Sequence, residues 1–121
     1  MQLIKSIVRN LSTKTIERDQ WSELNEFHKV MSQTFHPSER GNLEPIRLRS
    51  REMVEKALAL QKGKIPSSFM TQDVAWAIDN LVSGSAGLHQ LIMDKADDKM
   101  IIIKLNELHD TFHVIQGVCR H

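Results

Sequence analysis

Several protein classes are excluded by what this sequence lacks. It has no tyrosine and only six aromatic residues, which gives little support to an all-β or α/β fold. It has a single cysteine, Cys119, so an internal disulfide framework is excluded. No stretch comes near the roughly 18 consecutive apolar residues that a membrane span needs. The N-terminal stretch contains Lys5, Arg9 and Asn10 and lacks the continuous apolar run of a signal peptide. We therefore expect no membrane span and a cytoplasmic location, or a periplasmic one if a signal peptide has been removed.

An excess of one charge is also missing. The chain has 16 Lys and Arg residues against 15 Asp and Glu, a net charge of +1, and neither sign gathers into a block. This balance gives no support for a nucleic-acid partner or an anionic membrane surface. Hydrophobic residues make up 40% of the 121 residues, enough to bury the core of one globular domain.

The chain has no β-hairpin signal, and its apolar residues recur at spacings of three and four, which is typical of amphipathic helices. In the first predicted helix, Asp19 is the N-cap and Pro37 stops the helix. The apolar stripe between them includes Trp21, Leu24, His28, Met31 and Phe35.

The second predicted helix follows a turn, is capped by Asn42, accepts Pro45 in its first turn and ends near Gly63. Its stripe includes Leu43, Ile46, Met53, Val54, Ala57 and Leu58. A connector over residues 64–70 is expected to cross one end of the molecule.

Thr71 is predicted to cap a third helix, whose stripe runs from Val74 to Ile92. Gly84 and Gly87 weaken this helix by roughly 1 kcal/mol each relative to alanine and often mark a close helix approach or a kink. Asp97 or Asp98 begins the last helix, which buries residues from Ile101 to Ile115 and extends to about Val118.

Four helices joined by short links favour an all-α fold, an antiparallel up-down four-helix bundle. We expect a single helical domain over residues 1–121, in which residues 1–18 form an arm or an extra short helix.

The candidate chemistry lies in six histidines. His109 and His113 are four residues apart on the last helix, about 40° apart around its axis and about 6 Å apart along it, so both imidazoles can converge on one metal ion. His28 occupies the apolar stripe of the first helix, where leucine would be the routine residue and a buried imidazole needs partners. If the first and last helices are antiparallel neighbours, these three histidines can meet.

His36, Glu44 and His89 are the further candidate ligands. The structural alternative for His36 is a C-terminal helix cap, and His89 is better explained as a structural residue than as a ligand. Cys119 is better read as a buried free thiol than as a ligand, and His121 is the last residue of the chain. Few carboxylates accompany the histidines, so we predict a mononuclear site for a divalent transition metal, with zinc ahead of copper and nickel, rather than a di-iron site.

Two phrases of the sequence carry a resemblance: Phe35-His36-Pro37 followed by Gly41 to Ile46, and Leu108 to Arg120 at the end. In these phrases the chain resembles a group of small bacterial helical proteins that have no established activity. The resemblance covers nearly the whole chain and implies that the histidines belong to a shared pattern consistent with a metal site.

Other bundle classes match less well. Hemerythrin-like proteins need an ordered set of histidine and carboxylate motifs; His109 with His113 and His89 with Asp94 supply two of them in the wrong order. Neither FHKVMS nor LHQLIM matches the phospho-accepting motif of a histidine phosphotransfer domain, and CxxCH is absent, although the six methionines leave a b-type haem open.

The leading hypothesis is therefore a metal-binding bundle with a role in binding or sensing rather than catalysis. The alternative is a bundle that binds a protein partner or another copy of itself. It rests on Trp76, which lies off the main stripe of its helix, and in it the histidines are structural.

Overall fold

The structure is a computed structural model that describes residues 20–117. Its elements in chain order are α2 (Ser22–Glu39), α3 (Glu44–Lys62), the short 3-10 helix η1 (Ser67–Phe69), α4 (Gln72–Met93) and α5 (Asp98–Gln116). Residues 20–117 contain no strand. The all-α four-helix fold predicted from the sequence is confirmed. The predictions for residues 1–18, Asp19, Val118, Cys119 and His121 fall outside the described residues.

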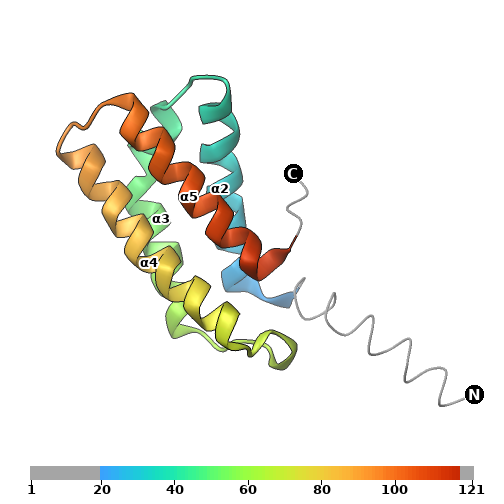
Figure 1. Ribbon diagram of the computed structural model, residues 1–121. Helices are drawn as coiled ribbons and strands as arrows, with labels where there is room; N and C mark the ends of the chain where they lie inside the picture. The colour runs from blue at the N-terminus through green and yellow to red at the C-terminus, as the bar shows by residue number, and fades with distance from the viewer. Residues whose placement is uncertain (1–19, 118–121) are drawn as a thin grey trace, which may run out of the picture.

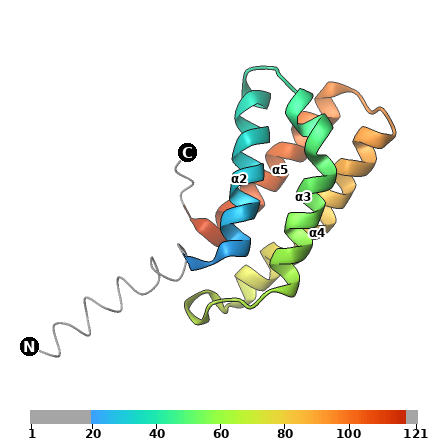
Figure 2. The same cartoon turned by 180° about the vertical axis from the view of Figure 1, so that it is seen from behind.

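The four helices alternate in direction, as Figure 1 shows from the reversal of the chain at each connection. Consecutive helices pack against each other, and α2 also meets α5 over a smaller interface. Figure 2, seen from behind, shows α2 and α3 side by side in front of α5 and α4. None of the described helices combines the length and apolar character needed to cross a bilayer.

Local capping signals predicted several helix ends correctly. The Thr71 hydroxyl accepts a hydrogen bond from the backbone N–H of Val74 at 3.2 Å, and the Asp97 carboxylate accepts one from Met100 at 3.0 Å. Gly63 ends α3, as expected. Asn42 lies one residue before the cap position of α3, and its side-chain oxygen accepts a hydrogen bond from the N–H of Glu44 at 3.1 Å.

The prediction that Pro37 stops the first helix is wrong, because α2 continues through Pro37 to Glu39. A proline removes the backbone hydrogen bond to the carbonyl four residues earlier and its ring crowds that carbonyl, a cost that is smaller where water can reach the carbonyl. Here the carbonyl belongs to Gln33, which is exposed to water. The helix therefore tolerates Pro37 in its last turn and ends at Glu39. Its C-cap is Arg40, whose N–H donates to the carbonyl of Pro37 at 3.0 Å.

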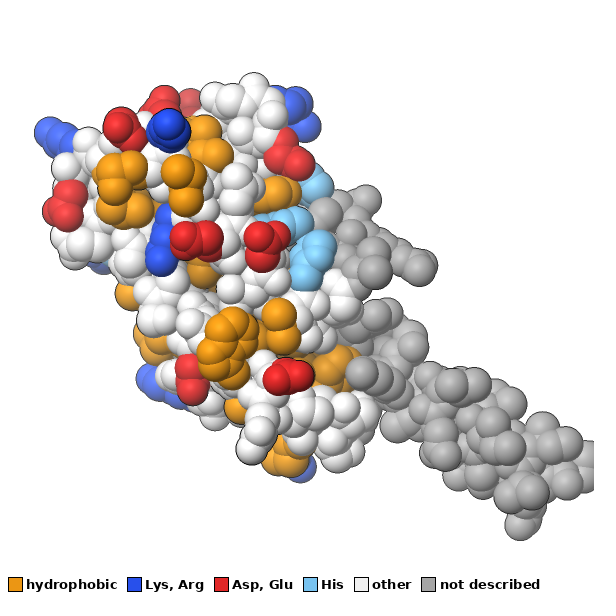
Figure 3. Space-filling model, in the orientation of Figure 1, with side chains coloured by type: hydrophobic (Ala, Val, Ile, Leu, Met, Phe, Trp, Pro, Cys, Tyr) orange, Lys and Arg blue, Asp and Glu red, His pale blue; other side chains and the backbone are white. Residues whose placement is uncertain are grey.

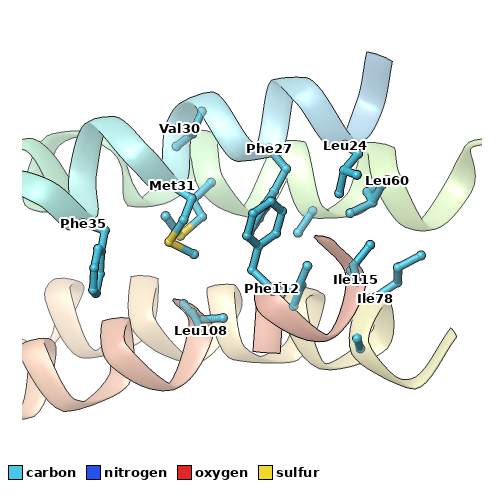
Figure 4. Close-up of a cluster of buried hydrophobic side chains, with 14 of the residues drawn as sticks. Leu24, Phe27, Val30, Met31, Phe35, Leu60, Ile78, Leu108, Phe112 and Ile115 are labelled. Atoms are coloured by element: carbon cyan, nitrogen blue, oxygen red, sulfur yellow. The ribbon is translucent and has the colours of Figure 1, made fainter. Parts of the chain in front are cut away.

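The core runs along the inner faces of all four helices. Within it, aromatic rings from different elements pack against each other. The rings of Phe27 on α2 and Phe112 on α5 lie 5.6 Å apart between centroids. Phe69 of η1 is buried with its ring 5.2 Å from that of Trp21, so the connector between α3 and α4 closes one end of the core. Figure 4 shows side chains of α2 (Leu24, Phe27, Met31, Phe35) facing side chains of α5 (Leu108, Phe112, Ile115).

The close helix approach suggested by Gly84 is confirmed. A Cβ atom at this position would lie 2.6 Å from Cδ2 of Leu108, so the backbone of α4 presses directly against α5 there. Gly84 of α4 and Leu108 of α5 therefore lie at the same level of the two antiparallel helices.

Candidate histidine site at the seam of α2 and α5

The two histidines of the i,i+4 pair face each other on α5. Their Nε2 atoms lie 3.3 Å apart, and their ring centroids are 4.4 Å apart with an interplanar angle of 61°. Both side chains are half-buried. The sequence prediction that His109 and His113 lie together is therefore confirmed at the level of their nitrogen atoms.

His109 is held in place by a ring of α2. Its imidazole stacks on the phenyl ring of Phe35 with centroids 3.8 Å apart and an interplanar angle of only 4°. Phe35 is buried, so it provides a fixed wall for the imidazole. Stacking against a fixed ring limits the rotamers of His109 and orients its Nε2 atom toward His113.

His36 follows Phe35 in the chain and lies near the same phenyl ring, at a centroid distance of 6.0 Å. Its Nδ1 atom is 3.1 Å from Oε1 of Glu39. A carboxylate that accepts a hydrogen bond from Nδ1 fixes the imidazole tautomer and leaves Nε2 as the nitrogen that can act as a ligand. The capping interpretation is also compatible with the position of His36, in the last turn of α2.

His28 contacts the other phenyl ring of this region. Its imidazole stacks on Phe112 with centroids 5.3 Å apart and an interplanar angle of 28°. Because Phe112 immediately precedes His113, the side chain of His28 belongs to the same seam between α2 and α5. Figure 3 shows histidine side chains gathered at the surface in this part of the molecule, beside acidic side chains.

His89 and Glu44 lie elsewhere. Nδ1 of His89 is 2.8 Å from the hydroxyl oxygen of Ser50, a buried residue of α3, so this histidine bridges α3 and α4 instead of joining the α5 pair. Glu44 is the first residue of α3 and is exposed. Within residues 20–117, no three or more His, Cys, Asp or Glu side chains are grouped closely enough to hold one ion.

The charged residues of α3 form contacts of a different kind. Arg47 pairs with Asp98 at the start of α5, and Arg49 donates to both Gln33 of α2 and Glu52. The hydrogen bond from Arg49 holds the pKa of the Glu52 carboxyl below its ordinary value. Because Glu52 and Arg49 are partly exposed, solvent screens this pair and its effect on stability is small.

The sequence interpretation missed the phenyl partners of the histidines, although a signal for them exists. Three Phe-His dipeptides, at residues 27–28, 35–36 and 112–113, each place a buried phenylalanine before a half-buried histidine. In a helix, neighbouring residues lie about 100° apart, so such a pair marks the border between core and surface. All three pairs lie at the seam of α2 and α5.

Comparison of the chain with protein-family models, with curated proteins and with solved structures finds no match.

Proposed function

We propose that this protein binds a divalent transition-metal ion through the Nε2 atoms of His109 and His113. The observation that supports this most directly is their separation of 3.3 Å. Two nitrogen ligands at about 2.0 to 2.1 Å from a tetrahedral zinc ion are themselves about 3.3 to 3.4 Å apart. Without an ion, the same distance fits a hydrogen bond between the two imidazoles, which a bound ion would replace. Imidazole ligands suit zinc, copper and nickel, of which zinc is the first choice.

The surroundings of the pair favour a metal site because they reduce the cost of ordering its ligands. The stack of His109 on Phe35 restricts the imidazole before any ion arrives. Ligands that are already oriented lose less conformational entropy on binding, which raises affinity.

His36 is the best candidate for a third ligand. It shares Phe35 with His109, and Glu39 occupies its Nδ1 atom, as carboxylates commonly do for histidines that ligate metals through Nε2. A side-chain rotation of His36 would be required. His28 is the alternative third ligand from the same helix, and solvent would fill the remaining positions.

The proposed role is metal binding or sensing, which the sequence analysis placed ahead of catalysis.

The direct experiment is a calorimetric titration of the tag-free, full-length chain with Zn²⁺ at pH 7.5. We expect one ion per chain. His109→Phe keeps an aromatic ring against Phe35 but removes one ligand, and His113→Gln removes the other. Each of these variants is expected to weaken zinc binding by about 100-fold or more. Glu39→Gln removes only a carboxylate that orients a ligand, so we expect it to weaken binding by about tenfold.

His89→Gln is the matched control, because His89 bonds Ser50 between other helices and its loss should leave zinc affinity unchanged. Absence of stoichiometric binding in the wild-type chain, or equal affinity in wild type and His109→Phe, would refute the proposal.

A further inference from the structure

The outer face of α4 and α5 presents apolar side chains to water at both of its ends. At one end lie Leu91, Met100 and Ile103, which we call the Met100 patch; Met100 and Ile103 are about half exposed. At the other end lie Trp76, 57% exposed, and Val114, 44% exposed, which we call the Trp76 patch. The contact of Gly84 with Leu108 sets a register that brings Val114 close to the level of Trp76.

The centre of this face is polar. Lys104 and Glu107 lie there with Nζ and Oε2 3.9 Å apart. They border a hollow of about 280 Å³ that is also lined by Asn80, Ser83 and Thr111. Figure 3 shows the resulting pattern, in which orange patches above and below are separated by blue and red side chains.

We propose that this face is the interface of a homodimer with twofold symmetry. A twofold axis that lies in the plane of this face, across the helices at the polar centre, places the Trp76 patch of each copy against the Met100 patch of the other. It also places Lys104 of each copy beside Glu107 of the second copy, which makes the centre self-complementary in charge. A partner that carried charges of only one sign would pair with either Lys104 or Glu107, but not with both.

The dimensions of the two ends suit this arrangement. The Met100 patch, together with Lys104 and Glu107 at the edge of the polar centre, lines a hollow of about 230 Å³ on the surface, which an exposed indole can fill. Along α4, Trp76 and Leu91 are about 22 Å apart, a span on the scale of an interface that buries about 800 Å² on each copy. Buried tryptophans contribute strongly to the affinity of interfaces of this kind.

The test is sedimentation equilibrium of the full-length chain with EDTA present, so that the outcome is independent of metal binding. We expect a monomer–dimer equilibrium, in which Trp76→Ala raises the dimer Kd by about 30-fold. Leu48→Ala is the control, since Leu48 is 74% exposed on α3, away from this face, and its loss should leave the Kd unchanged. Lys104→Glu should weaken the dimer, and the double exchange Lys104→Glu with Glu107→Lys should restore it.

Emission of Trp76 gives a second measurement. Trp21 is buried within each copy and keeps its environment, so a blue shift of emission on raising the protein concentration reports burial of Trp76. A wild-type chain that stays monomeric at about 1 mM would overturn the proposal, as would a Trp76→Ala variant that dimerises as tightly as the wild type.

Discussion

At the scale of single residues, a buried hydroxyl on α4 is unexplained by the fold. The side chain of Ser85 is fully buried, and its hydroxyl has no hydrogen-bond partner among residues 20–117. An unsatisfied buried hydroxyl destabilises the folded state, and alanine is in addition the better helix former.

We therefore expect Ser85→Ala to increase the free energy of unfolding by about 1 kcal/mol. Denaturant unfolding of the apo protein measures this directly. Ser50→Ala serves for comparison, because Ser50 is equally buried but bonds His89 at 2.8 Å, so its loss should destabilise the chain. A decrease in stability for Ser85→Ala would show that the hydroxyl has a partner in solution.

The convergence of His109 and His113 could be predicted from spacing alone, because both lie on one helix whose geometry is regular. The stack of His109 on Phe35 could not be predicted. It depends on how α2 and α5 are rotated about their axes, which is decided by packing across the whole core. The same holds for the Ser50–His89 bond, which joins residues of different helices.

At the scale of helices, the two glycines of α4 behave differently despite their spacing of three. A Cβ on Gly84 would meet Cδ2 of the buried Leu108 at 2.6 Å, whereas a Cβ on Gly87 would meet only the flexible end of Lys104 at 3.4 Å. Alanine is favoured over glycine in a helix by about 0.5 to 1 kcal/mol, and overpacking of a core costs about 1 to 3 kcal/mol.

We expect Gly87→Ala to stabilise the chain by about 0.5 to 1 kcal/mol and Gly84→Ala to destabilise it by about 1 kcal/mol. Thermal and denaturant unfolding of the two variants, measured in parallel, give the sign of each effect. If both substitutions stabilise the protein, α4 and α5 approach each other less closely than the structure shows.

Helix ends were predictable where one local signal decides them, as at Thr71, Asp97 and Gly63. The prediction that the first helix stops at Pro37 was wrong because the rule that a proline ends a helix assumes that the freed carbonyl has no other partner. Whether that carbonyl reaches water depends on burial, and the sequence around residue 33 does not specify burial. The exposure of Trp76 could be predicted from its place off the stripe, whereas the hollow lined by Met100 could not, because it forms between two helices.

At the scale of the whole molecule, the proposed metal site lies where the bundle closes. The first and last described helices, α2 and α5, meet over a smaller interface than the consecutive pairs do. An ion held by His109 and His113 of α5 and by a histidine of α2 would join these two helices. Because the ion would bind the native state and not the unfolded chain, its binding free energy would stabilise the whole fold.

The most direct test of metal binding at this seam is the difference in Tm with and without Zn²⁺, measured at pH 7.5 and at pH 5.5. Protons compete with metal for imidazoles, which ordinarily titrate near pH 6.5, so stabilisation is present above that range and is lost as the pH falls through it. With zinc at 100 times its Kd, we expect the Tm of the wild-type chain to rise by roughly 10 °C at pH 7.5 and to change little at pH 5.5. We expect zinc to cause no rise in the Tm of the His109→Phe, His113→Gln double variant. A difference near zero at both pH values, or an equal rise in the double variant, would contradict metal binding by this pair.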